Sequence, residues 1–134
     1  MLGEKIGEGI GKVISQRVLP AVAGVPTVET SFQSKGKLMG LDSSETGTYC
    51  ATLRPDGTLF GQGQGIVQGP PGEVASWTGQ GVGLPQRDGS IKYRGAIYFE
   101  SKSPTWSRLA TVAALFEYEV DAQGQTKGQL FEWK

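Results

Sequence analysis

Histidine is absent from this sequence of 134 residues, and cysteine occurs once, as Cys50. Without histidine the chain cannot form a Ser-His-Asp triad, a Cys-His pair or a histidine-ligated metal site. A single cysteine excludes an intramolecular disulfide and a zinc site with several cysteines, and it fits a reducing compartment. No catalytic motif can be assigned, so the catalytic residues stay unknown, and we expect neither a metal ion nor a cofactor.

Charge is also scarce and balanced. Lys+Arg and Asp+Glu number 13 each, so the formal net charge is +0, and charged residues make up 19% of the chain. Proteins that bind nucleic acid or an anionic membrane usually carry a basic excess, so we expect neither partner. No apolar run has the length of a membrane span, and the first residues lack the basic and apolar regions of a signal peptide. We therefore expect a cytoplasmic protein.

Glycine, in contrast, is abundant, with 21 residues. It recurs at every second position in two stretches, on either side of a Gly-Pro-Pro-Gly-Glu turn at residues 69–73. Alternate residues of a strand share a face, so each stretch has glycine on one face and glutamine on the other. A hairpin closed by this turn places Gly63 opposite Gly79 and Gln62 opposite Gln80. Strand glycines indicate bends or close backbone approach, which a small barrel needs in order to close.

From Thr46 onward, turn signals recur at regular intervals between β-rich runs, which predicts an antiparallel meander. Arg-Pro-Asp-Gly at residues 54–57 is typical of a three-residue hairpin loop, and it places Cys50 opposite Gln62. The polar residues 41–45 are interpreted as a turn.

We interpret the next turn signal, at residues 87–90, as a two-residue Asp-Gly hairpin. This loop sets Gln80 opposite Ile97, and therefore joins the glutamine face to the apolar face of residues 93–99. The interpretation points the glutamines into the barrel and the glycines, together with Trp77, outward.

The predicted fold is all-β, an antiparallel up-and-down β-barrel of about eight to ten strands. Residues 1–11 are rich in glycine, and we predict a flexible N-terminal arm there, followed by a single barrel domain over residues 12–134. The long connection after Glu100 allows one helical turn that carries Trp106 and Leu109 across a barrel end.

The inward glutamine face makes the barrel interior the candidate site. Two alternatives stay open: the amides satisfy one another and neighbouring threonines in a filled core, or they face water and a ligand in an apolar cavity. The candidate ligand-binding residues are Gln62, Gln64, Gln80, Phe60, Tyr93, Ile97, Phe99 and Tyr118.

Several segments carry a resemblance to known proteins. They are Arg-Pro-Asp-Gly-Thr-Leu-Phe-Gly-Gln-Gly-Gln-Gly at 54–65, Trp-Thr-Gly-Gln-Gly-Val-Gly at 77–83, Tyr-Arg-Gly-Ala-Ile-Tyr-Phe at 93–99, Phe-Glu-Tyr-Glu-Val-Asp at 116–121, and the ending Phe-Glu-Trp-Lys. The chain resembles a family of small uncharacterised prokaryotic proteins and is more distantly similar to the allene oxide cyclase-like, calycin-type β-barrels. The resemblance implies a hydrophobic cavity used for cyclisation or for holding a small apolar molecule, and it suggests a homo-oligomer.

Two functions follow as hypotheses. The first is a barrel that binds a small apolar ligand with a polar head, or a cofactor-free cyclase or isomerase. The second is a structural or protein-interaction barrel with a filled core and no ligand. A cavity of about 300 Å³ or more would favour the first.

Overall fold

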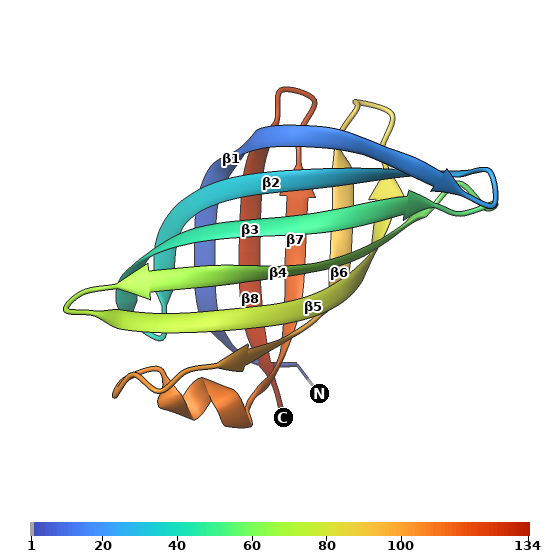
Figure 1. The fold of residues 1–134 in the computed structure, drawn as a ribbon. Coiled ribbons are helices and arrows are strands. Elements are labelled where there is room, and N and C mark those ends of the chain that lie inside the picture. Colours follow the sequence, from blue (N-terminus) through green and yellow to red (C-terminus); the bar gives the residue numbers. More distant parts are fainter. Residues whose placement is uncertain (1) are drawn as a thin grey trace.

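The computed structural model describes residues 2–134 and shows a closed barrel in which each strand pairs with the next and β8 closes onto β1 (Figure 1). All of these pairings are antiparallel. The strands are β1 (Leu2–Val22), β2 (Val25–Leu38), β3 (Leu41–Leu53), β4 (Leu59–Gly69), β5 (Glu73–Pro85), β6 (Ile91–Glu100), β7 (Ala113–Val120) and β8 (Gln125–Trp133). The all-β, up-and-down barrel predicted from the sequence is therefore confirmed. Within residues 2–134, no helix is long and apolar enough to cross a membrane.

The N-terminal residues differ from the prediction. Residues 2–11 form the first half of β1, which pairs with both β2 and β8, whereas Met1 lies outside the described residues. Gly9 lies opposite Gly36 on one side and Gly128 on the other. A Cβ atom on Gly36 would collide with the backbone of Glu8. The glycines in this region therefore allow close strand packing, and the expectation of a flexible arm over residues 1–11 was wrong for residues 2–11.

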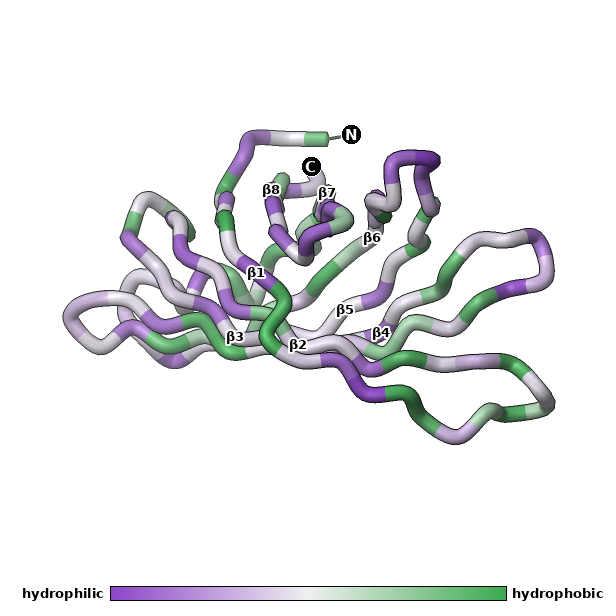
Figure 2. The backbone as a smooth tube through the Cα atoms, turned by 90° about the horizontal axis from the view of Figure 1, so that it is seen from above, coloured by the Kyte–Doolittle hydropathy of each residue, from purple (hydrophilic) through white to green (hydrophobic). Residues whose placement is uncertain are grey.

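Part of the sheet extends beyond the barrel wall. β1 pairs with β8 as far as Lys12, which lies opposite Gln125, and its later residues pair with β2. Val18 and Val22 lie on this extension and are exposed. Figure 2, which views the molecule from above, shows hairpin ends projecting to two sides of the central barrel.

The register between β5 and β6 corrects the predicted face assignment. The loop contains three residues, because the backbone N–H of Gln86 donates to the backbone carbonyl of Ser90 at 2.8 Å. Inside the loop, the Asp88 carboxylate accepts from both the backbone N–H and the hydroxyl of Ser90. Gln80 consequently pairs with Ala96 and not with Ile97. A shift of one residue exchanges the two faces of a strand, so the glycines face inward and the glutamines outward.

Trp77 shows what the inward glycines accommodate. Its buried indole ring packs against the bare backbone of Gly65 and Gly47, and a Cβ atom on Gly47 would lie 2.9 Å from the ring. The same added Cβ atom would lie 2.7 Å from the Phe32 ring. Trp77 therefore lies inside the barrel, and its predicted outward orientation was wrong for the same reason as that of the glycines.

One end of the barrel is covered by the connection between β6 and β7, which includes the short 3-10 helix η1 (Ser107–Thr111) (Figure 1). Trp106 and Leu109 are completely buried there. The indole N–H of Trp106 donates to the Leu38 carbonyl at 3.0 Å. The buried Glu73 carboxylate accepts from the backbone amides of Thr105 and Trp106, at 2.8 and 2.9 Å. The predicted helical turn across a barrel end is confirmed.

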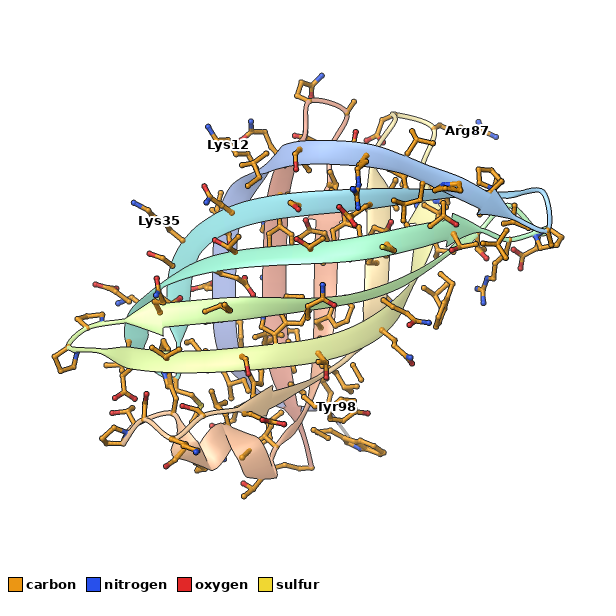
Figure 3. All side chains as sticks on the ribbon, viewed as in Figure 1. Lys12, Lys35, Arg87 and Tyr98 are labelled. Atoms are coloured by element: carbon orange, nitrogen blue, oxygen red, sulfur yellow. The ribbon has the colours of Figure 1, made fainter. Side chains whose placement is uncertain are left out.

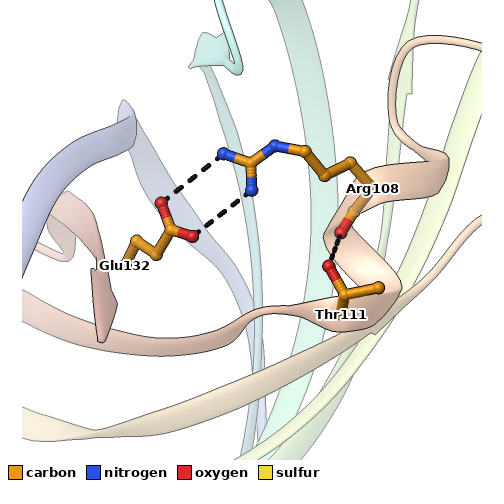
Figure 4. A network of polar contacts seen from close by, with 3 residues as sticks. All are labelled: Arg108, Thr111 and Glu132. Carbon is orange, nitrogen blue, oxygen red and sulfur yellow. Dashed lines mark hydrogen bonds and ion pairs between the residues drawn. The ribbon is translucent and has the colours of Figure 1, made fainter. Parts of the chain in front are cut away.

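A second set of contacts ties η1 to the last strand (Figure 4). The Arg108 guanidinium group donates to both carboxylate oxygens of Glu132 on β8, at 3.3 and 3.5 Å. The Thr111 hydroxyl donates to the Arg108 carbonyl at 2.8 Å. The covering segment is therefore held at β2, β5 and β8 together.

Candidate functional site

The barrel interior contains a mainly apolar cavity of about 130 Å³ that is partly open to the outside. Its walls include the side chains of Phe32, Trp77, Tyr93, Ile97, Phe99 and Tyr118. Ligand pockets for drug-sized molecules usually measure about 300 Å³ or more, so this cavity is smaller than the sequence interpretation required. An apolar cavity of about 150 Å³ nevertheless takes up benzene, and the space here suits a single six-membered ring.

The predicted ligand-binding residues separate into two groups. Tyr93, Ile97, Phe99 and Tyr118 line the cavity from β6 and β7.

The other group lies on the outer face. Gln62, Gln64 and Gln80 are exposed, and Phe60 shares their face on β4, where its ring lies 5.8 Å from the Arg54 guanidinium carbon. Gln62 and Gln80 border the cavity, but strand alternation turns their side chains away from it, so they contribute backbone. The inward orientation predicted for these residues was wrong, because it depended on the one-residue error at the Asp88 loop. Figure 3 shows side chains such as Lys12 and Lys35 on the outer surface.

Glu45 is the functional candidate that the sequence interpretation missed. It lies in β3, lines the cavity, and accepts hydrogen bonds from the Ser34 hydroxyl at 3.1 Å and from the Trp77 indole N–H at 2.7 Å. Burial raises the pKa of the Glu45 carboxyl, while these two hydrogen bonds oppose the rise. The alternation of Glu45, Gly47 and Tyr49 was the available signal, but residues 41–45 had been interpreted as a turn.

Three tyrosines from β3, β6 and β7 meet in the interior. The Tyr49 ring lies 5.6 Å from Tyr93 and 5.9 Å from Tyr118, edge to face in both cases, and Phe32 lies 5.3 Å from Tyr118. Burial raises the pKa of the Tyr118 hydroxyl far above its usual range, and the nearby hydroxyl of Tyr49 and carboxylate of Glu45 raise it further. Tyr118 is therefore neutral and able to donate a hydrogen bond at any physiological pH.

The Tyr118 hydroxyl is also the one buried side-chain polar atom among residues 2–134 without a hydrogen-bond partner of good geometry. Buried polar groups are normally paired, and leaving one unpaired costs about 1–3 kcal/mol. The Tyr49 hydroxyl is its polar neighbour, but the contact between them does not have good hydrogen-bond geometry. The cavity thus combines a poorly satisfied donor, an oriented carboxyl group and apolar walls. In the described part of the chain, no group of three or more Cys, Asp or Glu residues is arranged to hold a metal ion.

Comparison with known proteins reveals relatives in fold. No family model and no curated protein matches the chain. A conserved protein of unknown function from Rhodopseudomonas palustris has a TM-score of 0.82 at 11% sequence identity, over 98% of this chain and 97% of that one. A protein of unknown function from Clostridium acetobutylicum has a TM-score of 0.82 at 11% identity, over 96% of each chain. A beta-barrel like protein from Acinetobacter baumannii has a TM-score of 0.83 at 10% identity, over 100% of this chain and 96% of that one. Similarity at these identities establishes a shared β-barrel fold.

Proposed function

We propose that the barrel binds a compact, mainly apolar molecule, about the size of one six-membered ring, through a polar group that contacts Tyr118 and Glu45. The observation that carries this proposal is the buried, unpaired Tyr118 hydroxyl on the wall of an apolar cavity. A ligand oxygen that accepts from Tyr118 removes the cost of the unpaired hydroxyl.

The side chains that line the cavity favour ligand binding over the second hypothesis, a structural or interaction barrel with a filled core. A filled core needs only apolar side chains, and phenylalanine would pack in place of Tyr118 without an unpaired group. Glu45 gives a second argument, because burying a carboxyl group costs free energy that a core of apolar side chains would avoid. The cavity volume also narrows the ligand class: about 130 Å³ suits a small ring better than the long flexible substrate of a cyclase.

Titration with phenol and with toluene tests the proposal, because the two molecules differ by one hydroxyl group. Nuclear magnetic resonance should show saturable shifts of the Trp77 indole N–H and of the interior tyrosine rings with both probes. Tyr118→Phe should bind phenol about five-fold more weakly, the equivalent of about 1 kcal/mol for one hydrogen bond, and should bind toluene as well as the wild type does.

Tyr98→Phe is the matched control, since Tyr98 lies on the outer face and is 56% exposed (Figure 3). It should leave the affinities for phenol and toluene unchanged. Shifts confined to outer residues, or no shifts at all, would show that the interior binds neither probe and would contradict the proposed function.

A further inference from the structure

We infer that the same cavity catalyses proton transfer beside the carbonyl group of a small cyclic ketone, with Glu45 as the general base and Tyr118 as the hydrogen-bond donor to the carbonyl oxygen. This inference rests on the proposed binding function and adds a reaction and a substrate class to it.

The positions of the two residues in the barrel support this division of roles. Glu45 is on β3 and Tyr118 is on β7, and in a closed barrel of eight strands in chain order these strands are separated by three others in each direction. The two side chains therefore come from opposite walls, and both line the same cavity. A ring between them presents its oxygen to one residue and a carbon-bound hydrogen to the other.

Glu45 is oriented for proton abstraction. Ser34 on β2 and Trp77 on β5 each donate to a different carboxylate oxygen, at 3.1 and 2.7 Å. These two contacts fix the plane of the carboxylate, and each oxygen retains a lone pair for a substrate proton. A base held in this way, beside an apolar cavity, has the arrangement that general base catalysis requires.

Tyr118 supplies the complementary electrostatic contribution. When a proton leaves the carbon beside a carbonyl group, negative charge develops on the oxygen, and a donor placed there in advance stabilises it. The Tyr118 hydroxyl is buried without a hydrogen-bond partner of good geometry, and the polar group beside it is the Tyr49 hydroxyl, whose weak contact a substrate oxygen would replace. A phenol donor combined with a carboxylate base is an established solution for moving a double bond next to a ketone.

The reaction balances without an oxidant or a cofactor. With 3-cyclohexen-1-one, the Glu45 carboxylate takes a proton from C2, so that a C–H bond breaks, an O–H bond forms, and the electron pair moves to the carbonyl oxygen held by Tyr118. Glu45 then returns the proton to C4, where a new C–H bond forms. The product, 2-cyclohexen-1-one, has its double bond conjugated with the carbonyl group.

Ultraviolet absorbance of the conjugated product measures the rate. Wild-type protein should isomerise 3-cyclohexen-1-one faster than buffer. Glu45→Gln should reduce the protein-dependent rate at least about 100-fold, and Tyr118→Phe at least about 10-fold, while both variants still bind cyclohexanone. The matched controls Glu100→Gln and Tyr98→Phe change exposed side chains and should keep the wild-type rate.

A second measurement needs no variant. In heavy water, wild-type protein should accelerate deuterium incorporation beside the carbonyl group of cyclohexanone, as followed by nuclear magnetic resonance. If cyclohexanone shifts the interior resonances but neither reaction is accelerated, the catalytic inference is wrong and the binding function stands. If cyclohexanone, phenol and toluene all leave the interior resonances unchanged, both are wrong.

Discussion

The Glu45 carboxyl lines the cavity and receives hydrogen bonds from the Ser34 hydroxyl and the Trp77 indole N–H. The hydrogen bonds favour the ionised form and burial favours the neutral form, and burial is the larger effect. The folded state therefore binds the Glu45 proton more tightly than the unfolded state does. The stability that this proton binding contributes is fully present below the ordinary pKa of 4.5 and is lost as the pH rises through the higher folded pKa.

Glu45→Gln should consequently raise the thermal midpoint at pH 7, because the buried charge is removed while a glutamine can still accept from Trp77 and donate to Ser34. The gain should shrink as the pH falls towards 4, where Glu45 is itself becoming neutral. The interior tyrosines stay neutral throughout, since burial raises the pKa of each. Thermal melts at both pH values, with Glu100→Gln as the exposed control, measure this difference. A lower midpoint for Glu45→Gln at pH 7 would show that the two hydrogen bonds outweigh the burial of the charge.

The inward glycines and outward glutamines of β4 and β5 should respond differently to larger side chains. A Cβ atom on Gly63 would lie 2.5 Å from the Thr48 carbonyl oxygen, and one on Gly79 would collide with Ile97. Gly63→Val and Gly79→Val should therefore each cost about 1–3 kcal/mol or more in the free energy of unfolding, measured by denaturant titration. Gln62→Leu with Gln80→Leu replaces exposed side chains and should change it by less than about 0.5 kcal/mol each. If the glycine variants retained wild-type stability, the assignment of the faces would be wrong.

The lengths of the hairpin loops set the strand register, and the register determines which side chains face the cavity. The loop after Arg54 was predicted correctly, and the Arg54 amide donates to the Thr58 carbonyl at 2.8 Å. The loop before Ser90 has the same chemistry, because Asp56 accepts from the amide and hydroxyl of Thr58 just as Asp88 does from Ser90. Asp-Gly-Thr and Asp-Gly-Ser are therefore one loop motif. Treating them alike would have set the correct register for β6.

The pairing of β3 with β4 and of β4 with β5 was also predicted correctly, with Cys50 opposite Gln62 and Gly63 opposite Gly79. Neither pairing says which face is inside, because both faces of β4 are short of large apolar side chains. The inner face of β4 and β5 was therefore inferred from β6, which has an obvious apolar face. Because the predicted register between β5 and β6 was wrong by one residue, the inner and outer faces were exchanged. Cys50 consequently shares the outer face with Gln62, and not the inner face expected for it.

The segment around η1 closes one end of the barrel, and Trp106 is the larger of its two completely buried side chains. Trp106→Ala should lower the free energy of unfolding by about 3–5 kcal/mol, because a fully buried indole and its hydrogen bond to Leu38 are lost together. Trp133→Ala is the control, since Trp133 is 59% exposed and should change stability little. Denaturant titration measures both variants. Equal effects would mean that the covering segment does not stabilise the barrel.

The closed barrel as a whole explains why the sequence revealed the fold more readily than the site. Regular turns and alternating strands are local signals, and they predicted the meander and its covering turn. The candidate site combines Glu45 and Tyr118, which come from opposite walls and are 73 positions apart in the chain. No local pattern relates them. Their proximity follows from closure of the barrel, which determines what lies across its interior.

Two glycines in the cavity wall allow the interior to be filled without disturbing the fold. A Cβ atom on Gly61 would lie 3.5 Å from Tyr93, and one on Gly128 would lie 3.6 Å from Tyr118, both ordinary contact distances. Both residues line the cavity. Gly61→Ala with Gly128→Ala should therefore preserve or slightly raise stability, by about 0.4–1 kcal/mol for each residue, while it reduces the space for a ring.

Calorimetric titration of phenol into this double variant tests most directly whether the barrel interior is the binding site. We predict that phenol binds the wild type and the outer-face control Gln62→Ala equally, and that it binds the double variant at least about ten-fold more weakly, a loss of about 1.4 kcal/mol. A folded double variant that binds phenol with wild-type affinity would show that the ligand does not occupy the cavity between Glu45 and Tyr118.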